Sequence, residues 1–301
     1  MSGDTAQRKR EPSNQGITYQ FLVEDAKALL YDHCETPRID AEILMQHITK
    51  KPLSWLISYG ERMASAEHIK HFYQLVTKRQ QGQPIAYLIG ERDFWSLTLT
   101  VNEHVLIPRP DTETLVEAAL PLIPNSVNTA ILDLGTGSGT IALSLAKERP
   151  SSMVTAVDYH QNALNVAKHN AKRNDINNVN FIQSNWFSSL ESSVTFDLIA
   201  SNPPYIEPNN SHLEQGDLRF EPTSALVAQE NGLADLSTII KTAPTYLKAN
   251  GWLIVEHGYN QAKEVKELLE HYGFSSVVLY YDLNELPRCT LGQHKGVSKI
   301  I

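Results

Sequence analysis

Along residues 110–301, short apolar runs alternate with longer segments whose apolar residues recur at helical spacing. Runs of this length predict buried strands, and they lie near 130–134, 153–158, 179–182, 196–201, 251–256 and 277–281. The segments between them predict helices near 141–146, 160–173, 233–248 and 260–272. Alternation of this kind is typical of α/β proteins. We therefore expect a doubly wound, mostly parallel, Rossmann-like sheet with helices on both faces.

The first part of the chain carries a different pattern. Apolar residues at helical spacing follow Pro37, and a second stripe begins after Ser65 and stops before Gly82 and Pro84. A proline at a first helical position, and glycine or proline just past an end, are typical helix boundaries. The pattern predicts a small helical bundle over residues 17–85. Such stripes more often form a core than a docking face.

Between the bundle and the sheet, apolar and polar residues alternate. The apolar positions are Trp95, Leu97, Leu99 and Val101, followed after the polar pair Asn102-Glu103 by Val105 and Ile107. Alternation on both sides of a polar pair predicts a β-hairpin. The hairpin would form a linker over residues 86–109 and leave residues 110–301 as the second domain. Residues 1–16 are polar without periodicity and predict a disordered extension.

Charge divides the chain in the same way. Residues 1–100 carry twelve acidic and twelve basic side chains, so the net charge of −8 falls on residues 101–301. Nucleic-acid binding usually requires a basic face, so this acidic part favours a protein substrate and we expect no nucleic-acid substrate.

Two further observations bear on the surroundings of the protein. The only cysteines, Cys34 and Cys289, suggest neither a disulfide framework nor a metal site, and we expect no metal. No stretch approaches the ~20 apolar residues of a membrane span, and no hydrophobic signal core is present. We expect a cytoplasmic protein that does not contact membranes.

A glycine-rich turn follows the first strand of the sheet. Gly135-Thr136-Gly137-Ser138-Gly139 stands between the strand and a helix, where missing side chains let a ligand approach the backbone. Because Thr140 occupies the place of the third glycine in the dinucleotide fingerprint, a pyrophosphate cradle is disfavoured. Asp158 ends the second strand, where an acid suits both hydroxyls of a ribose. These residues indicate an adenosyl ligand.

The tetrapeptide Asn202-Pro203-Pro204-Tyr205 follows the fourth strand. Prolines fix φ and lack N–H groups, so the turn is stiff and presents mainly acceptors. The Asn202 side-chain oxygen and the Pro203 carbonyl could receive both N–H bonds of a planar NH2 group, on a carboxamide or an aminopurine. Holding both hydrogens favours the state in which the nitrogen lone pair is localised. The simpler interpretation is a proline-rich turn that caps a strand.

Together these motifs resemble the class I S-adenosylmethionine-dependent methyltransferases, and within them the release factor glutamine methyltransferases of the HemK/PrmC family. The matching segments, spread from about residue 18 to residue 292, are Leu106 to Glu113, Asp133 to Gly139, Asn202 to Tyr205, Arg219 to Pro222 and Glu256 to Gly258. The resemblance implies direct in-line methyl transfer from S-adenosylmethionine to the side-chain nitrogen of the glutamine in the Gly-Gly-Gln motif of class 1 peptide chain release factors. That modification belongs to translation termination.

The resemblance also implies roles for individual residues. The methyl donor would contact Gly135, Thr136, Gly137, Ser138, Gly139, Asp158, Trp186 and Asn202, and the glutamine would be held by Asn202, Pro203, Pro204 and Tyr205. Asn202 would orient the amide, Pro203 would accept its second N–H, and Tyr205 would pack against it. Asn185 stands where the family usually has an acid, and its oxygen can still bond the adenine amine. The helical bundle would help to engage the release factor, and we expect a monomer.

Several residues keep two interpretations. Arg109 and Asp111 could line the entrance of the site, whereas capping of the next helix by Asp111 or Thr112 is slightly favoured. Glu256-His257 fits structural support better than a base. The segment 206–231 either closes over the substrate or is an ordered loop packed through Leu213, Leu218 and Phe220.

Other functions also remain open. An N6-adenine methyltransferase of nucleic acids would meet the same pair of N–H donors, a ribosomal-protein glutamine methyltransferase is a close relative, and a non-catalytic protein could sense the methyl donor.

Overall fold

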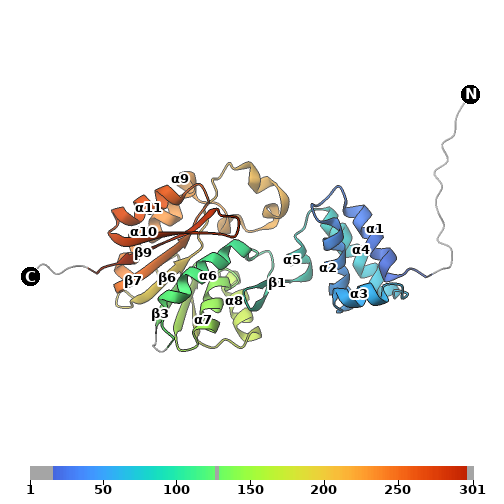
Figure 1. The fold of residues 1–301 in the computed structure, drawn as a ribbon, viewed down its shortest axis with the longest axis horizontal. Helices are drawn as coiled ribbons and strands as arrows, with labels where there is room; N and C mark the ends of the chain where they lie inside the picture. The colour runs from blue at the N-terminus through green and yellow to red at the C-terminus, as the bar shows by residue number, and fades with distance from the viewer. Residues whose placement is uncertain (1–15, 126–128, 297–301) are drawn as a thin grey trace, which may run out of the picture. The chain divides into compact units, whose positions relative to one another are not determined.

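The computed structural model describes residues 16–125 and 129–296. The chain divides into two compact units, Met1–Ile89 and Gly90–Ile301, and both are drawn in Figure 1. The predicted disordered extension lies outside the described residues apart from Gly16.

The first unit is helical, as predicted. It contains α1 (Tyr19–Leu30), α2 (Pro37–Thr49), α3 (Leu53–Tyr59), α4 (Ala66–Gln80) and α5 (Ile85–Ile89). Helix α4 begins after Ser65, whose Oγ accepts the N–H of His68 at 3.1 Å. Phe72 and Val76, from the predicted stripe of this helix, are buried against residues of α1 and α2. The stripe therefore forms the core of the unit.

The second unit begins with the predicted hairpin, but its turn was placed wrongly. The strands are β1 (Glu91–Phe94) and β2 (Leu97–Thr100), and Phe94 pairs with Leu97, so the turn lies at Trp95-Ser96 rather than at Asn102-Glu103. Trp95 adopts a left-handed conformation with φ 54°, and its indole N–H donates to Glu148 at 2.9 Å. Two-residue hairpin turns usually contain glycine, asparagine or aspartate. Because a tryptophan is unusual there, the sequence pattern did not indicate the turn.

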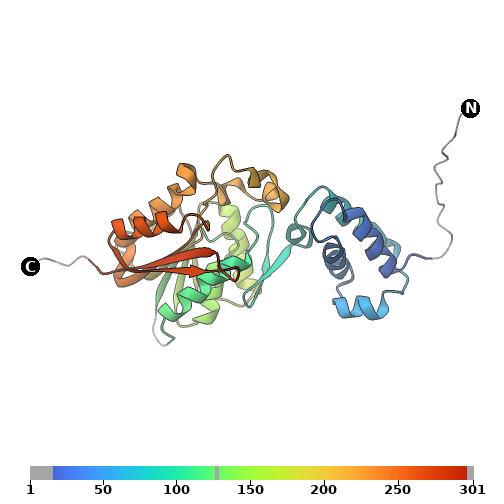
Figure 2. The ribbon, with the colours of Figure 1, turned by 45° about the horizontal axis from the view of Figure 1, so that its top comes forward.

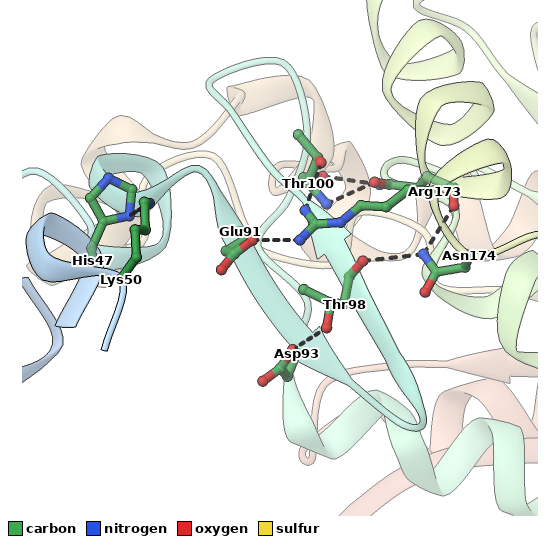
Figure 3. A network of polar contacts seen from close by, with 9 residues as sticks. His47, Lys50, Glu91, Asp93, Thr98, Thr100, Arg173 and Asn174 are labelled. Carbon is green, nitrogen blue, oxygen red and sulfur yellow. Dashed lines mark hydrogen bonds and ion pairs between the residues drawn. The ribbon is translucent and has the colours of Figure 1, made fainter. Parts of the chain in front are cut away.

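The C-terminal end of helix α8 (Gln161–Arg173) contacts the hairpin. Arg173 bonds the carboxylate of Glu91 at 2.6 Å and the hydroxyl of Thr100 at 3.2 Å, and Asn174 donates to the carbonyl of Thr98 at 3.1 Å. Figure 3 shows these side chains between the helix and the two strands. The hairpin is thus fixed to the sheet unit by polar contacts.

A seven-stranded sheet forms the centre of this unit, with the order β5-β4-β3-β6-β7-β9-β8. The strands are β3 (Ala130–Leu134), β4 (Met153–Asp158), β5 (Val179–Gln183), β6 (Phe196–Ser201), β7 (Leu247–Glu256), β8 (Phe274–Tyr281) and β9 (Pro287–His294). Strands β5, β4, β3, β6 and β7 are parallel, whereas β9 runs antiparallel to both its neighbours. The predicted α/β class is confirmed, and β9 is the strand that the pattern missed.

Helices cover both faces of the sheet (Figures 1 and 2). One buried cluster joins Ile131 of β3 to α6 (Glu113–Ala119) and α7 (Thr140–Glu148). The other joins Leu132 and Leu134 to α10 (Ala234–Tyr246) and α11 (Ala262–His271). Successive residues of a strand point to opposite faces, so β3 contributes to both cores. Among the described residues, none of the helices is long and apolar enough to cross a membrane.

The segment after β6 is ordered into short helical turns. It contains Ser211–Glu214, Gly216–Phe220, Thr223–Ala225 and α9 (Gln229–Gly232). Leu213, Leu218 and Phe220 are partly buried, in agreement with the packed-loop interpretation. Strand β3 has β4 on one side and β6 on the other. The chain reverses its direction of winding there, and ligands of such sheets bind at the carboxyl ends of the strands beside that point.

Candidate active site

The glycine turn after β3 is held by a buried acid. Asp133 accepts the Thr136 hydroxyl at 2.7 Å and the N–H of Ala142 at 3.1 Å through one oxygen. Its other oxygen has no hydrogen-bond partner among the described residues. Complete burial raises the pKa of Asp133 to about 7, although these hydrogen bonds oppose the shift. The two hydrogen bonds to this carboxyl hold the turn against the start of α7.

The three glycines of the turn have different reasons to be glycine, although each has φ between 55° and 89°. A Cβ on Gly135 would lie 3.3 Å from the ring of Trp186, whereas one on Gly137 would meet nothing within 4 Å. A Cβ on Gly139 would lie 2.8 Å from the Leu143 side chain. Gly139 is therefore needed for the packing of α7. Gly137 lines the cavity, and because it has no side chain the space beside it stays open.

Asp158 faces this turn from the end of β4. Its carboxylate accepts the N–H of Gly137 and the N–H of His160, each at 2.9 Å. A carboxylate offers about four lone-pair positions, so about two remain for a ligand. Burial raises its pKa above the ordinary value, and the two backbone N–H groups oppose the shift. The arrangement can receive two neighbouring hydroxyls.

A cavity of about 400 Å³ opens at the carboxyl ends of the strands, within the usual range for small-molecule sites. Of the predicted site residues, its lining includes Gly135, Thr136, Gly137, Ser138, Asp158, Asn185, Trp186, Asn202 and Pro204. Gly139, Pro203 and Tyr205 are not part of the lining. Residues that the sequence analysis did not single out also line it, among them His104, Tyr159, His160, Ser224 and Asp235.

Trp186 forms one wall in a strained backbone conformation. Its φ is 49°, which is uncommon for a bulky residue and frequent at functional sites. The indole N–H donates to Asp235 at 3.2 Å. Asp235 lies in the first turn of α10, where the sequence showed only an acid near a helix start. The contact holds the indole ring beside the glycine turn.

Asn202, at the end of β6, is oriented by a residue from a distant part of the chain. Its Nδ2 donates to the Thr112 hydroxyl at 3.2 Å. Asn202 lines the cavity, and its side-chain oxygen remains available there to accept a hydrogen bond. The expected capping by Thr112 was wrong, because Thr112 precedes α6 but makes no side-chain capping bond. Thr112 therefore serves tertiary contacts instead.

Tyr205 is held behind the cavity. Its hydroxyl donates to Glu256 at 3.3 Å, and burial raises the pKa of Tyr205 above its ordinary value. Its carbonyl accepts the side-chain N–H of Gln261 at 3.1 Å. A Cβ on Gly232 would lie only 2.1 Å from this carbonyl oxygen. The end of the tetrapeptide is thus enclosed on several sides.

Glu221 ties together two segments that line the cavity. It forms an ion pair with Arg109 and accepts the N–H of Ile107 at 3.0 Å. Burial raises the pKa of Glu221, and the Arg109 charge opposes the shift. Arg109 lines the cavity, as one interpretation expected, whereas Asp111 pairs with Arg288 at 3.0 Å. Within the described part of the chain, no three His, Cys, Asp or Glu side chains gather to hold a metal ion.

Comparison with known proteins agrees with this geometry. Residues 22–90 match the PrmC N-terminal domain, and residues 125–293 match a methyltransferase domain. The release factor glutamine methyltransferase of Yersinia pestis is 50% identical over 277 residues, which cover 92% of this chain and 99% of that protein. The one from Escherichia coli (strain K12) is 43% identical over 278 residues, with the same coverage. A methyltransferase structure from Pyrococcus furiosus is similar in fold, with a TM-score of 0.50 and 18% identity, over 67% of this chain and 91% of that one.

The strand order and the methyltransferase domain match define a class I methyltransferase. More particularly, the chain belongs to the release factor glutamine methyltransferases, since relatives from that family share about half of its residues over nearly its whole length. The predicted family and fold are confirmed.

Proposed function

We propose that the protein transfers a methyl group from S-adenosylmethionine to the side-chain nitrogen, N5, of the glutamine in the Gly-Gly-Gln motif of class 1 peptide chain release factors. One observation carries the proposal: Asn202, with its NH2 engaged by Thr112, lines the same cavity as Asp158 and the glycine turn. An amide acceptor and an adenosyl site therefore adjoin. Family membership supports the glutamine as the substrate group.

The residues present fit the methyl donor. The lone pairs of Asp158 that do not accept backbone N–H groups suit ribose hydroxyls. At Gly137 no side chain fills the cavity, so the ligand can approach the backbone. Asn185 and Trp186 are suited to the adenine, and Gly135 to Ser138 to the remainder of the molecule. S-adenosylmethionine supplies an electrophilic methyl group on a sulfonium sulfur. Gly139 lies outside the cavity lining and shapes the turn by its packing against Leu143.

Positioning provides most of the catalysis in this proposal. The Asn202 oxygen and the Pro203 carbonyl receive the two N–H bonds of the substrate amide, which favours localisation of the nitrogen lone pair. Well-oriented reactants gain on the order of 7–11 kcal/mol. The methylated nitrogen is acidic and releases its proton without a strong base. Pro204 forms part of the wall, and Tyr205 packs behind the amide rather than moving a proton, because its hydroxyl donates to Glu256.

The helical unit would dock the release factor, and the reaction would take place in the cytoplasm, where release factors act, with a monomeric enzyme. The net charge of −8 on residues 101–301 disfavours the alternative nucleic-acid substrate.

The test uses methyl-labelled S-adenosylmethionine with three acceptors in separate reactions. These are a class 1 release factor, the same factor with its Gly-Gly-Gln glutamine changed to alanine, and adenine-containing DNA. We expect label on the intact factor alone. Label on DNA alone would overturn the choice of substrate, and label on the altered factor would overturn the choice of glutamine. No label in any reaction would favour a protein that only senses the methyl donor.

A further inference from the structure

Asn170 is a fully buried asparagine on helix α8, with 0% of its surface exposed. It follows Ala163 and Ala167 at helical spacing, so the three side chains lie on one face of the helix. Ala163 lines the cavity, and the Cβ of Ala167 lies 3.4 Å from the position of a Cβ on Gly139. An asparagine on such an apolar face is favourable only where its polar atoms are paired.

The side-chain amide of Asn170 bonds two segments that are distant in the sequence. Its Nδ2 donates to the carbonyl of Ser138 at 2.9 Å and to the carbonyl of Thr100 at 3.0 Å. Its Oδ1 accepts the N–H of Thr100 at 2.7 Å. All three partners are backbone groups, which can only donate or only accept. A reversed amide would place donor against donor and acceptor against acceptor, so its partners fix its orientation.

Ser138 belongs to the glycine turn and lines the cavity. Its neighbours Gly137 and Gly139 have φ of 55° and 89°. Because neither glycine has a side chain, sterics restrict the backbone on both sides of Ser138 very little. The bond from Asn170 therefore restrains a part of the turn that its own residues leave free to move.

Thr100 ends β2, and the chain continues from it into a second part of the cavity lining. Val101 is buried and donates to the Gly90 carbonyl at 3.1 Å, so the chain leaves the hairpin at a fixed point. The lining residues that follow are His104, Val105, Leu106, Pro108 and Arg109. One buried side chain thus joins the glycine turn to the segment that leads into residues 104–109.

We propose that Asn170 is a positioning residue, which holds the glycine turn and the segment 104–109 at the separation that the methyl donor requires. The inference rests on the proposed function for the identity of that ligand. Asn170 itself does not line the cavity, so it would act on the ligand through the backbone of Ser138 and Thr100.

Two other asparagines of the same region provide matched controls. Asn174 donates to the Thr98 carbonyl at 3.1 Å and so bonds the hairpin. Asn178 donates to backbone carbonyls before the start of β4, among them that of Ser152 at 3.0 Å. The cavity lies at the carboxyl ends of the strands, so Asn178 makes the same kind of bond at the opposite end of the sheet.

The first test measures the dissociation constant of S-adenosylmethionine by titration calorimetry for Asn170→Ala, Asn174→Ala and Asn178→Ala. We expect Asn170→Ala to weaken binding by about 10-fold or more, the usual effect of losing a buried hydrogen bond. Both controls should stay within about twofold of the wild type, even where their melting temperatures fall. An unchanged constant in Asn170→Ala, or an equal increase in either control, would overturn the proposal.

Asn170→Asp separates the two ends of the amide. Its carboxylate keeps an acceptor for the N–H of Thr100 but cannot donate to the Ser138 carbonyl. At about pH 8, where an aspartate is ordinarily ionised, we expect the affinity for S-adenosylmethionine to fall at least as far as in Asn170→Ala. Wild-type affinity in this variant would contradict the role of the bond to Ser138.

Hydrogen exchange in the ligand-free protein tests the contact without any substrate. The N–H of Gly139 bonds the Thr136 carbonyl at 2.8 Å within the turn. We expect it to exchange about 10-fold faster in Asn170→Ala than in the wild type, and to be accelerated more than the N–H groups of β3. No acceleration at Gly139, or an equal one in β3, would mean that Asn170 serves only general stability. Faster exchange at Gly139, with a wild type that does not bind S-adenosylmethionine, would contradict the proposed function alone.

Discussion

At the scale of single residues, Asn202 is the group on which the chemistry depends most directly. We expect Asn202→Ala to lower kcat by about 10²-fold or more, the usual effect of losing a positioned polar group. The dissociation constant of S-adenosylmethionine should change much less, because Asp158 and the glycine turn remain in place. Steady-state kinetics and titration calorimetry measure the two quantities. Equal losses in both would remove the amide-orienting role of Asn202.

Residue type explains which parts of the site could be predicted. Asp158 and Asn202 were found because an acid or an amide at a strand end indicates its chemistry without knowledge of the neighbours. The roles of Thr112 and Asp235 were not found, because they depend on tertiary partners. The bond from Asn202 to Thr112 joins positions 90 residues apart, and the bond from Trp186 to Asp235 joins positions 49 apart. A single sequence gives no signal for such pairs.

At the scale of elements, the turn before α10 encloses the tetrapeptide. Gly232 has φ 80°, and a Cβ there would lie 2.1 Å from the Tyr205 carbonyl oxygen. We expect Gly232→Ala to displace Tyr205, to lower kcat severely and to destabilise the protein. Gly273→Ala is the matched control, since φ is 83° but nothing lies within 4 Å of the added Cβ. It should lose only about 1 kcal/mol of stability and keep its kcat. Equal kcat in both variants would contradict the steric role of Gly232.

Elements with regular patterns were predicted well, and irregular ones were not. The parallel strands are short apolar runs, and the predicted segment 196–201 coincides with β6. Strand β9 begins Pro-Arg-Cys-Thr and lacks such a run, although Arg288 is buried there by its bonds to Asp282 at 2.8 and 3.2 Å. Arginine is mostly exposed in proteins, so the sequence alone predicts a surface position for Arg288 unless its partner is known. The hairpin turn at Trp95 was missed for the same kind of reason, since a tertiary contact holds it.

At the scale of the whole molecule, the pattern of apolar runs was sufficient for the architecture apart from strand β9. Alternating strands and helices predicted a doubly wound sheet, and helical stripes predicted a bundle before it. The carboxyl ends of parallel strands lie at one edge of a sheet, so the same pattern also brought Gly135, Asp158 and Asn202 together. What it could not give was the enclosure of the site by segments such as 104–112 and 222–225, which lie outside the strands of the structure.

The sheet unit carries four buried carboxyls whose pKa burial raises, and they predict how its stability depends on pH: Asp133, Asp158, Glu221 and Glu256. Burial raises the pKa of Asp133 from 3.8 to about 7 and that of Glu256 from 4.5 to about 7. Between the ordinary and the raised values, the folded protein holds protons that the unfolded chain has released. These groups therefore stabilise the fold at low pH, and this contribution is lost as pH rises toward and through about 7. His257 opposes the trend, since burial lowers its pKa.

Glu256→Gln isolates one of these contributions, because His257 and Asp133 are present in both proteins. The free energy of unfolding is measured by urea titration from about pH 5 to about pH 8. We expect the wild-type value minus the variant value to decrease as pH rises, by at most about 1.4 kcal/mol per pH unit. A difference that stays constant would mean that Glu256 has the same pKa in the folded and unfolded states. A difference that increases would mean that its neighbours, chiefly Thr112, Arg288 and Tyr205, outweigh burial and keep the carboxylate charged.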